Sequence, residues 1–172
     1  VRGIARDLAA AGVGKLKELR FKTIKETFKS PIKWNKDFKN NKLCPGVAGR
    51  YFKNVKNVES PEWLQKRLKA IGLRPISALV DITNYVTFDL GRPLHVYDAD
   101  KVSGSLTMRL AQNKEECMAL NEVNYICDEE MIVISDDNKN LHGIGGVMGG
   151  LNSGCSMGTK NVFLEVALFD PI

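Results

Sequence analysis

The sequence lacks several features that would place it in a specialised class of protein. No apolar run approaches the roughly 18 residues that a membrane-spanning helix requires, so the sequence predicts no membrane segment. The first residues, VRGIARDLAAAG, have neither the apolar core nor the cleavage pattern of a signal peptide. The chain also begins with Val1 rather than Met, so we expect a fragment of a longer, cytoplasmic protein.

Cysteine and histidine are too few and too scattered to suggest a metal site or a disulfide scaffold. The chain has four cysteines and two histidines: Cys44, Cys117, Cys127, Cys155, His95 and His142. No two cysteines form a C-x-x-C pair, which structural zinc sites require. Widely spaced cysteines of this kind favour a reducing compartment, and we expect no metal ligands.

Positive charge is concentrated near the N-terminus. Of the 25 basic residues, 13 lie between Lys15 and Lys56, together with only three acidic ones, which gives that stretch a net charge of +10. Such a stretch can bind the phosphates of a nucleic acid, or it can be a solvated linker that its lysines keep soluble. The sequence alone leaves both interpretations open.

The order of expected elements indicates an α+β fold. We expect a short helix over residues 3–12, a basic connector to residue 43 with at most one short strand, and a first strand from Tyr51 to Val58. Two helices follow: one has Ser60 as N-cap, Pro61 at its first position and Trp63, Leu64, Leu68 and Ile71 as its apolar stripe, and the other ends at Gly91. The rest is short strands separated by turns. We therefore predict two N-terminal helices packed on a mainly antiparallel, multi-stranded core, sandwich-like and three-layered.

The stretch GIGGVMGG, Gly143 to Gly150, contains five glycines and does not fit a phosphate-binding loop. Met148 occupies the sixth position, where a dinucleotide fingerprint needs glycine, and no helix-forming sequence follows. Glycine has no Cβ, so the pairs ending at Gly146 and Gly150 could line a tight pocket. A twisted strand with bulges explains the glycines equally well.

Three motifs give the sequence a specific resemblance. VDITNYVTFDLGRPLHVYD (80–98), GIGGVMGGLNSG (143–154) and TKNVFLEVALFDP (159–171) resemble the editing module of bacterial phenylalanyl-tRNA synthetase beta subunits. CPGVAGRYFKNV (44–55) fits the same module, and VRGIARDLAA resembles the piece before it. The resemblance divides the chain into a connector, 1–43, and an editing domain, 44–172, that is truncated on its C-terminal side.

The resemblance implies the site residues. In this family the module hydrolyses tyrosine wrongly esterified to tRNA(Phe), and the matching pocket residues are Thr83, Asn84, His95, Gly149 and Glu165. We add Gly146 from the double-glycine pattern. The resemblance implies that Glu165 accepts the hydroxyl of tyrosine in a charge-assisted hydrogen bond. Phenylalanine would leave that carboxylate desolvated and unpaired. The alternative is a solvent-facing glutamate on a half-exposed strand.

Other roles are left open. His95 could accept a proton from the attacking water, hold that water or the terminal ribose, or be a packed turn residue. Thr83 and Asn84 could orient water or the substrate's amino group, or cap a helix. No serine lies in a nucleophile elbow, so direct attack by water is favoured, and His142 is interpreted as structural.

The resemblance also implies which partners the intact enzyme has and which part of the pocket this chain lacks. The intact enzyme would combine two alpha and two beta subunits, bind tRNA(Phe) and use ATP and magnesium; we expect no cofactor in this fragment and no aminoacylation by it. In the family a later strand and loop carrying a Thr and an Ala complete the pocket, and this chain ends at Ile172, before that loop. Two alternatives to editing are a non-catalytic RNA-binding module and a structural spacer.

Overall fold

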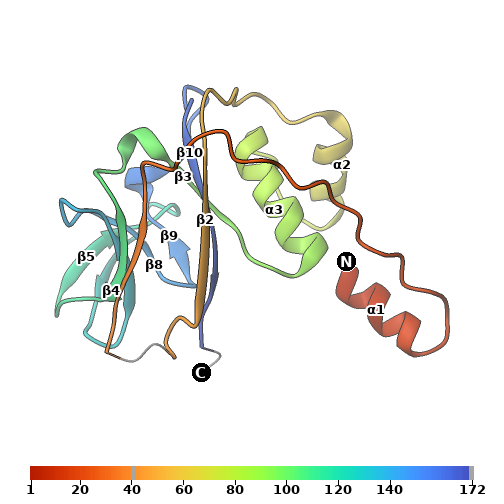
Figure 1. Ribbon diagram of the computed structural model, residues 1–172, viewed down its shortest axis with the longest axis horizontal. Coiled ribbons are helices and arrows are strands. Elements are labelled where there is room, and N and C mark those ends of the chain that lie inside the picture. The colour runs from red at the N-terminus through yellow and green to blue at the C-terminus, as the bar shows by residue number, and fades with distance from the viewer. Residues whose placement is uncertain (40–41, 171–172) are drawn as a thin grey trace.

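The computed structural model describes residues 1–39 and 42–170. Positions 40–41 and 171–172 lie outside the described residues, and so does Pro171 at the end of the third motif. The described chain forms three layers: two helices, a three-stranded sheet and a larger sheet on the other side (Figure 1). The predicted α+β class and layered core are confirmed. Within the described residues, no helix has the length and apolar character needed to cross a membrane.

The larger sheet has five strands in the order β1-β4-β7-β8-β9. Their bounds are β1 Trp34–Asp37, β4 Leu106–Leu110, β7 Ile132–Ser135, β8 Leu141–Ile144 and β9 Met148–Gly149. β1 runs parallel to β4, and every other pair in this sheet is antiparallel. A separate antiparallel pair, β5 Glu115–Met118 and β6 Asn124–Cys127, extends beside it. The predicted run of short strands is therefore confirmed.

The smaller sheet has β10 Val162–Leu168 at its centre, between β2 Gly46–Phe52 and β3 His95–Asp98. Successive side chains of a strand alternate between faces. Phe163 and Tyr97 are opposite each other in the register and are almost fully buried. They belong to the core cluster between the two sheets, which also contains Leu106, Met108 and Ile134.

The predicted first strand, Tyr51 to Val58, is misplaced toward the C-terminus. β2 starts at Gly46 and ends at Phe52, because it pairs residue by residue with β10, from Val162 opposite Phe52 to Leu168 opposite Gly46. Local sequence does not contain that distant partner. The partner's length, rather than local propensity, sets the limits of this strand.

The helical layer consists of α2 Glu62–Ala70 and α3 Ala78–Leu90. Two strands, β1 and β2, precede this pair, so the two helices are not the first elements of the domain. A further helix, α1 Arg2–Ala10, buries none of its residues. Short 3₁₀ turns, η1 Ala99–Lys101 and η2 Leu151–Ser153, complete the described elements. α3 ends as predicted at Gly91, which has a left-handed backbone conformation with φ of 71°.

The predicted capping role of Ser60 is wrong. Pro61 occupies the N-cap position of α2, and the Ser60 hydroxyl donates instead to Asp81 of α3 at 2.5 Å. Asp81 is fully buried and also accepts from the Ile76 backbone N–H at 2.9 Å. A buried carboxylate needs donors, and this need recruits Ser60 to join the two helices.

The predicted apolar stripe of α2 is only half buried. Leu64 and Leu68 are each 1% exposed, whereas Trp63 and Ile71 are about half exposed. Trp63 lies edge-on to Tyr85 of α3, with ring centroids 5.7 Å apart. The helix therefore buries a narrow seam of leucines, while Trp63 and Ile71 stay partly exposed.

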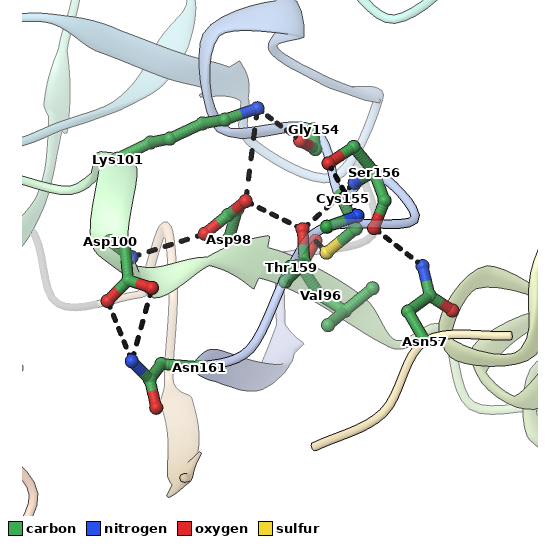
Figure 2. A network of polar contacts seen from close by, with 11 residues as sticks. Asn57, Val96, Asp98, Asp100, Lys101, Gly154, Cys155, Ser156, Thr159 and Asn161 are labelled. Carbon is green, nitrogen blue, oxygen red and sulfur yellow. Dashed lines mark hydrogen bonds and ion pairs between the residues drawn. The ribbon is translucent and has the colours of Figure 1, made fainter. Parts of the chain in front are cut away.

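A polar network fastens the ends of β3 and β10 (Figure 2). Thr159 donates to the buried Asp98 carboxylate at 2.6 Å, and the Asn161 side-chain amide donates to Asp100 at 2.9 Å. Asn57 donates to the backbone carbonyl of Ser156 at 2.9 Å. These contacts join the loop before β10 to β3 and to the helical layer, and so fix the two strands that carry His95 and Glu165.

The basic connector is mostly irregular. Every residue from 13 to 31 is exposed, and the chain passes the helices before it reaches β1 (Figure 1). Few contacts hold it: the Arg50 guanidinium donates to the Ile24 carbonyl at 2.6 Å, and the Phe28 ring is edge-on to Tyr51. The one short strand expected in the connector is β1.

Candidate functional site

A cavity of about 320 Å³ lies between the two sheets. It brings together the three motifs that are far apart in the sequence: the LGRPLHVY turn into β3, the glycine-rich β8–β9 hairpin, and β10. Four of the six predicted site residues line it, namely His95, Gly146, Gly149 and Glu165. The pairing of β3 with β10 explains why two of these residues meet: His95 and Glu165 are opposite each other in the register of the two strands.

Thr83 and Asn84 are not among the residues that line the cavity. They lie in the middle of α3, on the other side of the three-stranded sheet from β8 and β9 (Figure 1). The Thr83 hydroxyl donates to the Val80 carbonyl at 2.7 Å, and Ser77 occupies the N-cap position of the helix. The pair therefore neither caps α3 nor joins the other four residues.

Glu165 points into the space between the sheets and is 5% exposed. Its Oε2 accepts a hydrogen bond from the phenol of Tyr97. Its Oε1 has no partner among the described residues and is not sealed from the cavity. Burial raises the pKa of Glu165, and the Tyr97 hydrogen bond opposes that rise. The carboxylate therefore has one oxygen occupied and one free to accept a ligand hydroxyl.

His95 is held against two neighbours. Its ring lies edge-on to Tyr97 with centroids 4.3 Å apart, and it packs on Gly149. Its Nε2 is buried without a partner, whereas Nδ1 is not sealed off and also has no partner among the described residues. Burial, assisted by repulsion from His142, lowers the pKa of His95 to about 4.

The lowered pKa limits what His95 can do chemically. The imidazole is neutral at pH 7, so in the tautomer that carries its proton on Nε2 the Nδ1 atom can accept a hydrogen bond from water. A general base is most effective when its pKa lies near the working pH, and His95 is about three units below it. The lowered pKa of His95 favours a role in orienting water over complete removal of a proton from it.

Because these glycines have no side chain, other groups of the chain lie very close to their backbone. A Cβ on Gly149 would collide with the His95 ring, and one on Gly150 would lie 2.7 Å from the backbone of His142. Gly146 has a φ of 73°, where a side chain would be strained, and lies against the Phe169 ring. Both interpretations of the glycine stretch thus contribute: it forms a tight hairpin, and that hairpin lines the cavity.

Two further side chains line the cavity: Tyr97, which the sequence did not mark as a site residue, and His142, which was interpreted as structural. Tyr97 is two residues from His95, so strand alternation places both on the same face, and that signal was present in the sequence. His142 is 1% exposed; its Nε2 is 3.1 Å from Asp136, and its Nδ1 has no partner. No local pattern predicted His142 as a cavity residue, because its position depends on its partner Asp136, which lies in the tight turn between β7 and β8.

The donor set does not suit a metal ion. No group of three or more His, Cys, Asp or Glu side chains comes close enough to hold a metal in the described part of the chain. The cavity lining is mainly apolar and glycine-rich, with one carboxylate, two imidazoles and, at its rim, the guanidinium of Arg92. Such a cavity suits an aromatic group with one polar substituent.

Comparisons with known proteins agree with this architecture. A family model described as the B3/4 domain matches residues 43–172. The chain is 54% identical over 172 residues to the phenylalanine–tRNA ligase beta subunit of Brucella abortus, covering 99% of this chain and 21% of that protein. The beta subunit of Mesorhizobium japonicum is also 54% identical, with 100% and 21% covered. The chain thus spans about a fifth of the length of these curated relatives.

One solved structure has a similar fold. An N-terminal fragment of the phenylalanyl-tRNA synthetase beta subunit from Pyrococcus horikoshii superposes with a TM-score of 0.60. The two sequences are 16% identical, and the match covers 96% of this chain and 50% of that one. At this identity the likeness describes the fold alone.

Proposed function

Because this chain belongs to the B3/4 domain family, we propose that it is the proofreading part of a phenylalanyl-tRNA synthetase beta subunit. In this proposal it hydrolyses the ester of tyrosine wrongly attached to tRNA(Phe). One observation carries the proposal: a buried carboxylate, Glu165, has a free oxygen in a cavity otherwise suited to an aromatic ring. The beta-subunit relatives, at 54% identity, support it.

Selectivity follows from the cost of an unpaired buried charge. Tyrosine and phenylalanine differ by one hydroxyl, which a site for phenylalanine rejects only weakly, by about a hundredfold. In the cavity the tyrosine hydroxyl would donate to Oε1 of Glu165. Phenylalanine would cover the same oxygen and supply no donor, which is unfavourable.

The chemical step is a hydrolysis by water. The water oxygen attacks the ester carbonyl carbon, the bond between that carbon and the ribose oxygen breaks, and the ribose hydroxyl recovers a proton. Nδ1 of His95, in the tautomer with the proton on Nε2, is a group in the cavity that can hold the water by accepting one of its hydrogens. Thr83 and Asn84 lie on α3, so their predicted contact with water or the amino group is not part of this step.

Features of the intact enzyme remain predictions. These are tRNA(Phe) and the alpha subunit as partners, a heterotetramer, a cytoplasmic location, and ATP and magnesium as the requirements of aminoacylation. The described residues offer no acidic cluster that fits magnesium. No step of the proposed hydrolysis therefore depends on ATP or a metal.

The test is hydrolysis of tyrosyl-tRNA(Phe) by the wild-type chain and by Glu165→Ala. Loss of a hydrogen bond to a buried charged group should slow tyrosine release by about 10- to 100-fold. Phenylalanyl-tRNA(Phe) should be hydrolysed slowly by the wild type and faster by Glu165→Ala, because the variant no longer leaves a buried carboxylate unpaired. Glu129→Ala, at an exposed glutamate away from the cavity, is the matched control. Equal rates for the wild type and Glu165→Ala would exclude the proposed role of Glu165.

A second candidate function is RNA binding by the basic connector. Five of its lysines, Lys15, Lys17, Lys22, Lys25 and Lys29, lie between residues 13 and 31, where every residue is exposed, so these five can approach phosphates. We expect the logarithm of tRNA affinity to fall linearly with the logarithm of salt concentration. Lys22→Ala and Lys25→Ala should each reduce that slope by about one, whereas Lys69→Ala on α2 should not. A slope that none of these variants changes would assign the connector a purely structural role.

A further inference from the structure

Tyr97 is the most enclosed aromatic residue of the cavity wall. It is fully buried, and its phenol donates to Oε2 of Glu165. Three rings surround it: His95 at 4.3 Å, Phe163 at 6.4 Å and His142 at 6.5 Å between centroids. Packing from three sides leaves the Tyr97 ring one orientation, so the direction of its hydroxyl is fixed by the core.

The Tyr97 hydroxyl settles the orientation of Glu165. A carboxylate has two equivalent oxygens, and either can accept a donor. Because Tyr97 occupies Oε2, the other oxygen is the one presented to the cavity. The same hydrogen bond favours the ionised carboxylate, which accepts a phenol hydroxyl without competing as a donor.

We infer that Tyr97 is a specificity-determining positioning residue, which fixes Glu165 so that a single carboxylate oxygen is available to one ligand phenol. This inference rests on the proposed function. Glu165 in this arrangement accepts two phenols, one from the chain and one from the ligand. Tyr97 acts through Glu165 and takes no part in the attack of water on the ester.

The inference separates Tyr97 from a residue that only fills the core. Tyr97→Phe keeps the ring and its three aromatic contacts and removes only the hydroxyl. Without that donor, the buried Glu165 carboxylate has no hydrogen bond to any described residue, so the pKa of Glu165 should rise further. A larger fraction of Glu165 would then be protonated, and a protonated carboxyl discriminates poorly between a phenol and a bare ring.

Several titratable groups surround Glu165, and their titrations have to be distinguished from that of the Glu165 carboxyl. They are Tyr97 and His95 on β3, Cys44 before β2, His142 on β8 and Arg92 at the cavity rim. A carbon-13 NMR titration of the Glu165 side-chain carboxyl reports that group directly, so the other groups do not obscure its midpoint.

The experiment compares the wild type with Tyr97→Phe, using Tyr125→Phe on the exposed side of β6 as control. Two quantities are measured: the ratio of hydrolysis rates for tyrosyl- and phenylalanyl-tRNA(Phe), and the Glu165 midpoint. Loss of one hydrogen bond to a charged group should lower the ratio about tenfold and raise the midpoint by about one pH unit. The lost selectivity should return as the pH is raised above the new midpoint.

Each outcome is decisive. A lower ratio together with a higher midpoint in Tyr97→Phe alone supports the inference. An unchanged midpoint, or a raised midpoint with wild-type selectivity at every pH, overturns it and leaves the proposed function standing. If the wild type does not prefer tyrosyl-tRNA(Phe), the proposed function fails and the inference fails with it.

Discussion

Glu165 and Asp136 are two buried carboxylates in different regions of the same double-sheet core. They differ in the number of hydrogen-bond donors that surround them. Asp136 is 3% exposed, in the turn between β7 and β8, and Glu165 is 5% exposed, in β10. Asp136 accepts from three backbone N–H groups, of Ser103, Asn138 and Asn140, at 2.9–3.1 Å. It also accepts from the side chains of Asn140 and His142 at 3.1 Å. Glu165 has one donor, Tyr97.

The number of donors decides the state of each carboxylate. Burial alone would raise the pKa of Asp136, but its hydrogen bonds lower that pKa to about 2. Burial dominates at Glu165, where one hydrogen bond is too little and the pKa is raised. A buried carboxylate with every lone pair satisfied anchors a turn. One with a free oxygen retains the capacity to bind.

The largest expected effect comes from neutralising each carboxylate in turn. Asp136→Asn puts an amide NH₂ among N–H donors and should destabilise the chain by about 3 kcal/mol or more. Glu165→Gln keeps an oxygen for Tyr97 and removes a disfavoured charge, so it should change stability by less than about 1 kcal/mol. Urea unfolding measures both. Equal losses in the two variants would contradict the comparison.

The pH dependence of stability should separate the two groups by sign. Asp136 has a folded pKa of about 2 against an ordinary 3.8, so its contribution is complete above pH 3.8 and is lost as the pH falls through 2. That contribution is roughly 2 kcal/mol. Glu165 has a raised folded pKa, so its penalty at neutral pH should be relieved as the pH falls toward 4.5.

The measurement is the unfolding free energy against pH for the wild type, Asp136→Asn and Glu165→Gln. His95, with a folded pKa of about 4 against 6.5, lowers stability as the pH falls between those values in all three proteins. Differences between wild type and variant remove that shared loss. As the pH falls, the stability of the wild type relative to Asp136→Asn should decrease between pH 3.8 and 2, whereas its stability relative to Glu165→Gln should increase toward pH 4.5. Parallel curves would refute the assignment.

The smallest expected effect comes from removing a single hydrogen-bond donor to Asp136. Asn140→Ala removes one of the side-chain donors to Asp136 and should cost about 1 kcal/mol. Asn138 donates to Asp136 only through its backbone, so Asn138→Ala keeps that bond and serves as control. Thermal unfolding distinguishes them. A similar midpoint for both variants would mean that the side-chain donor adds nothing to the turn.

Several parts of the fold and site could be predicted from local sequence. Gly91 stops α3 because glycine adopts the left-handed conformation that ends a helix. The short strands follow from apolar runs bounded by turns. Pairing His95 with Glu165 came from the resemblance, and both side chains do line one cavity.

Other parts depend on partners that local sequence does not reveal. Ser60 bonds Asp81 across the helix pair, and β2 takes its limits from β10. Tyr97 and Glu165 are 68 positions apart in the sequence, and the pairing of β3 with β10 brings them together. The placement of Thr83 and Asn84 away from the cavity likewise depends on how α3 packs, which the VDITNYV motif does not specify.

The first strand of the larger sheet has a consequence for where this module begins. The family match starts at residue 43, but β1, Trp34–Asp37, already forms the parallel edge beside β4, and Ile32 is buried in the core. A version trimmed to residues 43–172 would leave β4 with open backbone groups that invite pairing with another chain. A version of the module with a complete larger sheet therefore has to start near residue 30, upstream of the family match.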